Sequence, residues 1–113
     1  MSDPQARALV ALPGWTWAQG LPWIRYRASP MEHIRGYARL FGEPYPGAVI
    51  DLDHPSACGH LWAMLGPGWI ATTTDTDLAV VYSGSMLAEH DGPNLGRACA
   101  AALIARGYCG DKP

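Results

Sequence analysis

The sequence contains no long apolar run, and its first 15 residues do not have the pattern expected of a secretory signal peptide. No stretch reaches the roughly 18 consecutive apolar residues that a membrane-spanning helix needs, and residues 1–15 have neither a basic leading segment nor a small-residue cleavage site. The three cysteines, Cys58, Cys99 and Cys109, are odd in number and fit no disulfide framework. We therefore expect a cytoplasmic protein with reduced thiols and no membrane association.

The sequence also lacks the motifs of common catalytic and cofactor sites. It contains no glycine-rich phosphate loop and no G-x-S-x-G turn. The nearest approach to a site is the group Asp53, His54 and Cys58, in which the last two lie four residues apart, on one face of a helix. Helix capping explains the first two residues, and core packing explains the third. We therefore predict no enzymatic activity and no cofactor, with a small metalloprotein or enzyme centred on these three residues as the alternative.

The apolar content is sufficient for one folded domain. Of the 113 residues, 49% are hydrophobic, which makes disorder an unsuitable description. We expect a single domain over residues 1–113, in which residues 108–113 form a loose tail.

Charge is unevenly distributed along the chain. Residues 1–42 carry five arginines and two acids, a balance of +3, and residues 43–113 carry three basic and eight acidic residues, a balance of −5. Together they give the net charge of −2. A polarised surface of this kind favours electrostatic steering toward a protein partner, and it is too weak to indicate direct nucleic-acid binding.

Capping and stop signals predict four helices. Each start combines a capping residue with a proline in the first turn, and the starts are Ser2-Asp3-Pro4-Gln5, Ser29-Pro30-Met31-Glu32, Asp53-His54-Pro55 and Asp91-Gly92-Pro93. Stops follow at Pro13-Gly14, Gly42, Gly66-Pro67-Gly68 and Gly107. The second of these helices carries an apolar stripe from Met31 to Phe41.

Extended segments lie between these helices. Trp15–Ala18 and Leu21–Arg27 predict a hairpin across Gly20, and Ala48–Leu52 predicts a short strand. Trp69–Thr74 and Leu78–Ser83 predict two central strands, buried on both faces, around a turn at residues 75–77. The pattern therefore predicts an α+β fold with a small antiparallel sheet of β-hairpins packed against three to four helices.

Arginine and tryptophan gather in the first third of the chain. Five tryptophans and five tyrosines against one phenylalanine is a composition that suits both cores and binding surfaces. A tryptophan-rich core and a solvated helix face are the alternative interpretations. The residues that we predict to contact a partner are Trp17, Trp23, Arg25, Arg27, Arg35 and Arg39.

Three segments together resemble a loose group of short phage and prophage proteins. They are ALPGW at residues 11–15, DLDHPSACGHLWAML at residues 51–65 and the alanine-rich last helix. That group shows an early LPGW and a middle D-x-D-D-P-A-x-x-G segment, whereas this chain has Asp53-His54 at the second Asp–Asp step and Ser56-Ala57 where Ala–Thr is common. The resemblance covers about half of the chain and brings no catalytic residues with it.

The resemblance implies a phage-encoded accessory protein that works in the cytoplasm of the bacterial host. We predict that it binds a host or phage macromolecule as a monomer or homodimer, for example as an inhibitor of a defence system such as CRISPR–Cas. A self-assembling structural component of the phage is a further alternative.

Overall fold

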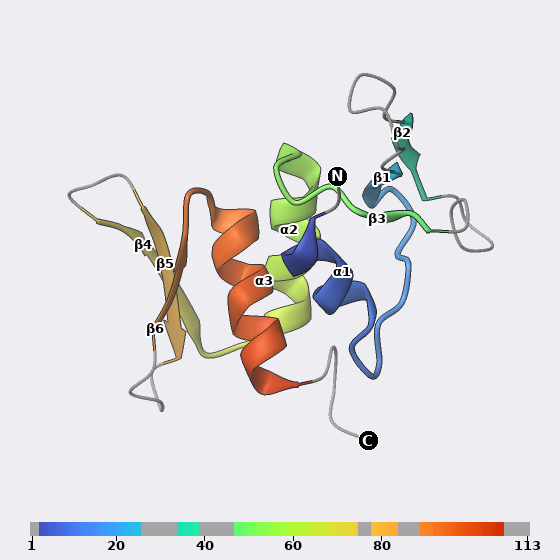
Figure 1. The fold of residues 1–113 in the computed structure, drawn as a ribbon. Helices are drawn as coiled ribbons and strands as arrows, with labels where there is room; N and C mark the ends of the chain where they lie inside the picture. The colour runs from blue at the N-terminus through green and yellow to red at the C-terminus, as the bar shows by residue number, and fades with distance from the viewer. Residues whose placement is uncertain (1–2, 26–33, 39–46, 75–77, 84–88, 108–113) are drawn as a thin grey trace.

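The computed structural model describes residues 3–25, 34–38, 47–74, 78–83 and 89–107. Its elements, in chain order, are α1 (Pro4–Val10), β1 (Pro22–Arg25), β2 (Ile34–Tyr37), β3 (Val49–Ile50), α2 (Pro55–Leu65), β4 (Trp69–Thr73), β5 (Ala79–Ser83), β6 (Glu89–Gly92) and α3 (Leu95–Arg106). The strands form two three-stranded antiparallel sheets, sheet A in the order β2-β1-β3 and sheet B in the order β4-β5-β6. The helices lie between the two sheets (Figure 1). The predicted α+β class is confirmed.

Sheet B is built from strands that follow one another along the chain. The predicted hairpin is present, with Trp69 opposite Ser83 and Thr73 opposite Ala79. Burial on both faces is wrong for β4, in which the four residues after Trp69 are exposed. The reason is that α3 packs on β5 and β6, so β4 lies at the edge of the sheet beyond the helix.

Sheet A joins segments that are distant in the sequence, and two predictions fail there. The hairpin across Gly20 is wrong, because residues 15–18 form no strand and β1 pairs with β2 and β3 instead. The Gly20 N–H donates to the Ala38 carbonyl at 2.9 Å, which continues the β1–β2 pairing. The indoles of Trp15 and Trp17 meet edge to face, 5.4 Å between centroids, and pack against the core.

The predicted helix from Pro30 to Phe41 is also wrong, since Ile34–Tyr37 is strand β2. Its apolar spacing fits a helix, but pairing with β1 overrides this local preference. Gly36, a poor helix former, lies opposite Trp23, and a Cβ there would stand 2.7 Å from Cζ2 of that indole. Residues 30–33 and 39–41 of this predicted helix fall outside the described residues.

Helix α2 follows its sequence signals closely. The His54 side chain accepts from the Ser56 N–H at 3.1 Å, and the helix ends before Gly66, whose φ is +83°. The predicted apolar row, Ala57, Leu61 and Leu65, is buried.

The other two helices begin one to three residues later than predicted. Asp3 caps α1, while Ser2 falls outside the described residues. Asn94 caps α3 by accepting from the Arg97 N–H at 2.9 Å. Asp91, the predicted cap, lies instead in strand β6. Asp91 pairs with Val80 in sheet B, so Asn94, an equally good capping residue directly before the helix, caps α3.

The core lies where α2 and α3 pack together between the sheets. Small residues on α3, such as Ala98 and Ala102, are fully buried, and Gly96 brings this helix close to the chain at Leu52. A Cβ at Gly96 would stand 2.7 Å from the Leu52 carbonyl oxygen. Within the described residues, no helix is long and apolar enough to cross a membrane.

Candidate functional site

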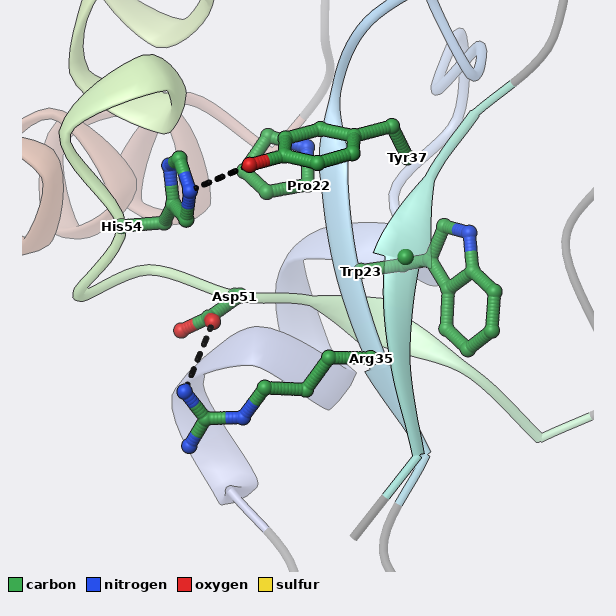
Figure 2. Close-up of a pocket in the computed structure, with 7 residues that line it drawn as sticks. Pro22, Trp23, Arg35, Tyr37, Asp51 and His54 are labelled. Carbon is green, nitrogen blue, oxygen red and sulfur yellow. Dashed lines mark hydrogen bonds and ion pairs between the residues drawn. The ribbon is translucent and has the colours of Figure 1, made fainter.

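A pocket of about 270 Å³ opens on one face of sheet A. We call it the β1–β2 pocket, and its lining residues are Pro22, Trp23, Arg35, Gly36, Tyr37, Asp51 and His54. Figure 2 shows Arg35, Tyr37, Asp51 and His54 on the same side of the strands, in two interacting pairs.

Strand geometry explains why these side chains converge. Arg35 and Tyr37 are two residues apart on β2, so they point to the same face of the sheet. Asp51 directly follows β3 on the other side of β1, where its N–H donates to the Pro22 carbonyl at 3.0 Å. His54 is held at the start of α2 by its capping bond. The pocket therefore collects polar side chains from two separate stretches of the chain, residues 35–37 and 51–54.

The first pair fixes the orientation of the tyrosine hydroxyl. Tyr37 Oη and His54 Nε2 are 2.9 Å apart, and the rings are perpendicular within a few degrees, at 88°. Since His54 Nδ1 accepts from the Ser56 N–H, the neutral imidazole carries its proton on Nε2 and donates it to Tyr37. The hydroxyl hydrogen of Tyr37 is then left to donate toward the pocket.

The second pair holds an exposed guanidinium. Arg35 Nη1 lies 3.8 Å from Asp51 Oδ2, which is an ion pair without hydrogen-bond contact. The Arg35 side chain is 66% exposed, whereas the Asp51 side chain is 12% exposed. Asp51 therefore biases the position of Arg35 while the guanidinium N–H groups keep their capacity to bind a ligand.

Of the six predicted contact residues, the four that the structure describes do not share one surface. Arg35 is in the pocket, but Trp23 is buried and its indole lies on the opposite side of the strands (Figure 2). Arg25 shares the face of Trp23 by strand alternation, and Trp17 packs near Trp15. Arg27 and Arg39 lie outside the described residues.

The sequence analysis assigned Tyr37 and Asp51 to no site, and it placed His54 in the alternative group with Asp53 and Cys58 instead of in this pocket. Tyr37 was hidden by the helix prediction for its segment. The alternation Arg35-Gly36-Tyr37 is the signal that could have found it, because it places two polar side chains on one strand face. Asp51 and His54 depend on a long-range approach that no local pattern encodes.

The group Asp53, His54 and Cys58 borders a second hollow, of about 290 Å³, between the starts of α2 and α3. Asp53 binds Arg97 through two hydrogen bonds, of 3.0 and 2.9 Å. The hydrogen bond from Arg97 lowers the pKa of Asp53 below its usual value. Across residues 3–25, 34–38, 47–74, 78–83 and 89–107, no three or more His, Cys, Asp or Glu side chains are grouped as metal ligands would be. Asp53 therefore serves to join helices.

Arg97 is the centre of this helix junction. Besides Asp53 it binds Asp3, the cap of α1, at 2.7 Å, and Gln5 at 3.2 Å. The Arg97 side chain is 19% exposed and that of Asp3 is 10% exposed. One guanidinium thus ties the beginnings of all three described helices together.

The chain was compared with protein-family models, with curated proteins and with solved structures, and none of the three comparisons finds a match. The resemblance to short phage proteins stays a prediction from the motifs.

Proposed function

We propose that the protein is a small accessory binding protein that docks an acidic side chain of a protein partner in the β1–β2 pocket. The observation that carries this proposal is a pair of donors on one strand face. Tyr37 is 56% exposed, and the Arg35 side chain is 66% exposed. A carboxylate accepts from both kinds of group, and charge-assisted bonds to arginine are among the strongest in proteins.

The charges around the pocket favour a protein over a nucleic acid. Among the lining residues that the structure describes, Arg35 is the one cation, and the Asp51 carboxylate lies next to it. A phosphate backbone presents a row of negative charges and would meet that carboxylate, whereas one carboxylate on a protein meets Arg35 alone. The partner class is therefore a protein with an exposed Asp or Glu.

The same geometry favours binding over catalysis. The Tyr37–His54 pair resembles an acid–base couple, but both Tyr37 and Arg35 are open to water. Preorganised charges accelerate reactions most in sites that exclude water. An exposed tyrosine beside an arginine is instead typical of contact residues in protein interfaces.

The phage setting implied by ALPGW and the segment at residues 51–65 supplies a class of partner. In that setting the protein occupies a surface of a host component, for example part of a defence system such as CRISPR–Cas. A protein that blocks a partner by covering its surface needs a docking surface and no catalytic activity. The β1–β2 pocket, in which Arg35 and Tyr37 are exposed, could supply such a surface.

The proposal is tested by capture from a bacterial host lysate with tagged protein. We compare the wild type, Arg35→Glu, Tyr37→Phe and the control Arg7→Glu, which makes the same charge change at an exposed position of α1. Wild type and Arg7→Glu should retain the same protein, while Arg35→Glu should lose it by about tenfold or more, equivalent to roughly 1.4 kcal/mol. Equal capture by Arg35→Glu, with its circular dichroism unchanged, would contradict docking in this pocket.

The defence-inhibitor form of the proposal has its own readout. We express each variant in a host with active CRISPR–Cas and count plaques of a targeted phage. Wild type and Arg7→Glu should raise the count, and Arg35→Glu should not. An unchanged count with the wild type would remove CRISPR–Cas as the target without bearing on docking itself.

A further inference from the structure

The two edges of sheet B differ in chemistry. Strand β6 carries Glu89 and Asp91, both exposed, whereas β4 has the sequence WIATT and no charge. Proteins commonly guard a free sheet edge with charged residues, prolines or bulges, because its unpaired main-chain groups can bind another strand. By this criterion β6 is a guarded edge and β4 is an open one.

The hydrogen-bond pattern shows which main-chain groups of β4 face outward. The Thr74 N–H donates to the Leu78 carbonyl at 2.9 Å, so position 74 points toward β5. The direction of the main-chain N–H and C=O groups alternates along an antiparallel strand. The main-chain groups of Ile70 and Thr72 therefore also face β5, whereas those of Trp69, Ala71 and Thr73 face away from it. In the part of the chain that the structure describes, β4 has a hydrogen-bonded neighbour on the β5 side alone.

We propose that β4 pairs with β4 of a second copy of this chain, antiparallel and centred on Ala71. In this register Ala71 lies opposite Ala71, and Trp69 lies opposite Thr73. These are the residues whose main-chain groups face outward, so the three opposed pairs can exchange up to about six hydrogen bonds. The two copies of sheet B, three strands each, then form one continuous sheet of six strands.

The same register covers an exposed apolar side chain. Ile70 is 46% exposed and is one of three large hydrophobic residues exposed on the described surface. In the proposed pairing it lies directly opposite Thr72 of the second copy, close enough for the two side chains to pack together. Pairing therefore removes apolar area from water as well as satisfying main-chain groups.

The distribution of charge favours pairing of two copies through β4 over pairing through β6. Pairing through β6 would bring the carboxylates of Glu89 and Asp91 close to their equivalents. In the β4 pairing, five strand spacings separate one β6 from the other, about 24 Å at 4.8 Å per strand. That distance exceeds the Debye length of about 8 Å at physiological ionic strength, so the carboxylates of β6 do not oppose association. A twofold contact also closes on itself and stops at the dimer.

Analytical ultracentrifugation over a concentration series tests the dimer. Wild type should associate, and Ala71→Lys and Ala71→Glu, which place like charges opposite each other, should each weaken association by about tenfold or more. An equal mixture of these two variants should dimerise again, and the control Ala8→Lys, an exposed position of α1, should behave as wild type. A wild type that stays monomeric, an Ala71→Lys variant that dimerises as the wild type does, or a mixture that fails to dimerise overturns the proposal.

Disulfide cross-linking tests which residues of the two β4 strands lie opposite each other, and it uses cysteine, a smaller side chain than lysine or glutamate. Residues opposed in a hydrogen-bonded antiparallel pair have Cα atoms about 5.5 Å apart, which a disulfide can span. Mild oxidation should therefore link Ala71→Cys into a covalent dimer, while Ala8→Cys should stay unlinked. Failure of Ala71→Cys to link in a sample that ultracentrifugation shows to be dimeric rules out the pairing centred on this residue.

Discussion

Sheets A and B have the same number of strands and the same antiparallel pairing, yet they present different chemistry. In sheet A the middle strand β1 is largely buried, and the edge strand β2 presents two exposed polar side chains, those of Arg35 and Tyr37. In sheet B the open strand β4 carries no charge, and what it offers is its main chain. A side-chain site can select one chemical group of a partner, whereas a main-chain edge selects any strand of compatible register.

The difference arises from connectivity. Sheet A assembles β1, β2 and β3 from separate stretches, and that assembly brings Asp51 and His54 to the pocket. Sheet B follows the chain order, and its last strand leads directly into α3. Because α3 packs over β5 and β6, the first strand is left beyond the helix layer.

The largest predicted effect is a difference in stability between glycine-to-alanine variants of the two sheets. An alanine Cβ at Gly92, in β6, would stand 2.9 Å from the main-chain nitrogen of Ala98, which cannot move without displacing α3. At Gly36, in β2, it would meet the Trp23 indole, which can shift. We expect Gly92→Ala to lower the free energy of unfolding by about 3 kcal/mol and Gly36→Ala by about 1 kcal/mol. Urea unfolding measures both.

Gly59→Ala is the matched control for these two changes. It lies in α2, where an added Cβ meets nothing within 4 Å. Alanine should stabilise this helix by about 0.5 to 1 kcal/mol. If Gly36→Ala destabilises the protein more than Gly92→Ala does, sheet A is the more rigidly held of the two.

The next effect concerns the junction that holds the helices between the sheets. Arg97→Gln removes the partner of Asp3 and Asp53 and leaves a largely buried carboxylate at Asp3. We expect a loss of about 2 kcal/mol, less than the cost for a fully buried pair. Thermal unfolding measures the loss, and Arg7→Gln, at an exposed position of α1, should change stability by less than about 0.5 kcal/mol.

This junction also gives the protein a pH dependence. The hydrogen bond from Arg97 holds the pKa of Asp53 below its ordinary value of 3.8. The unfolded chain therefore takes up a proton first as the pH falls, and the contribution of Asp53 to stability is present above about pH 4 and is lost as the pH falls through the folded pKa. Arg97→Gln should reduce the loss of unfolding free energy at acidic pH. If the loss is unchanged in this variant, other carboxylates cause it.

The smallest effect is a difference in thiol reactivity within the helix layer. Burial, with a smaller contribution from the neighbouring Cys58, raises the pKa of Cys99 to about 12. Cys99 is fully buried, whereas Cys58 is partly exposed. Iodoacetamide at neutral pH should therefore modify Cys58 and leave Cys99 unmodified in the native protein, as peptide mass spectrometry can show. Equal labelling of both would mean that the α2–α3 contact opens readily.

Sequence reasoning succeeded where structure is local. Helix α2 has a cap, a proline and a glycine stop within its own segment, and the β4–β5 hairpin has two β-rich runs around a short turn. It failed for β2, because an apolar stripe at helical spacing competes with a pairing to β1 that no local pattern records. The open character of β4 was missed for a related reason, since coverage by α3 is a property of the assembled fold.

The candidate site was partly predictable. Arg35 was predicted to contact a partner, and it lies in the pocket. Its neighbours Asp51 and His54 are distant from it in the sequence, so no local pattern could predict that they line the same pocket. Trp23 was expected at the surface and is buried, because Gly36 leaves room for its indole. Composition thus indicated that arginine and tryptophan would form the contact surface, whereas the pairing of β1 with β2 determines that Arg35 is exposed and Trp23 is buried.

A charge swap tests the central claim most directly. Once a partner has been captured, its acidic residues are changed to lysine one at a time, and binding to wild type and to Arg35→Glu is measured by calorimetry. One such change should weaken binding to the wild type by about tenfold or more and restore binding to Arg35→Glu, because the two charges have exchanged places. If every change affects both proteins equally, Arg35 does not meet an acidic side chain of the partner, and the assignment of the β1–β2 pocket as the docking site is wrong.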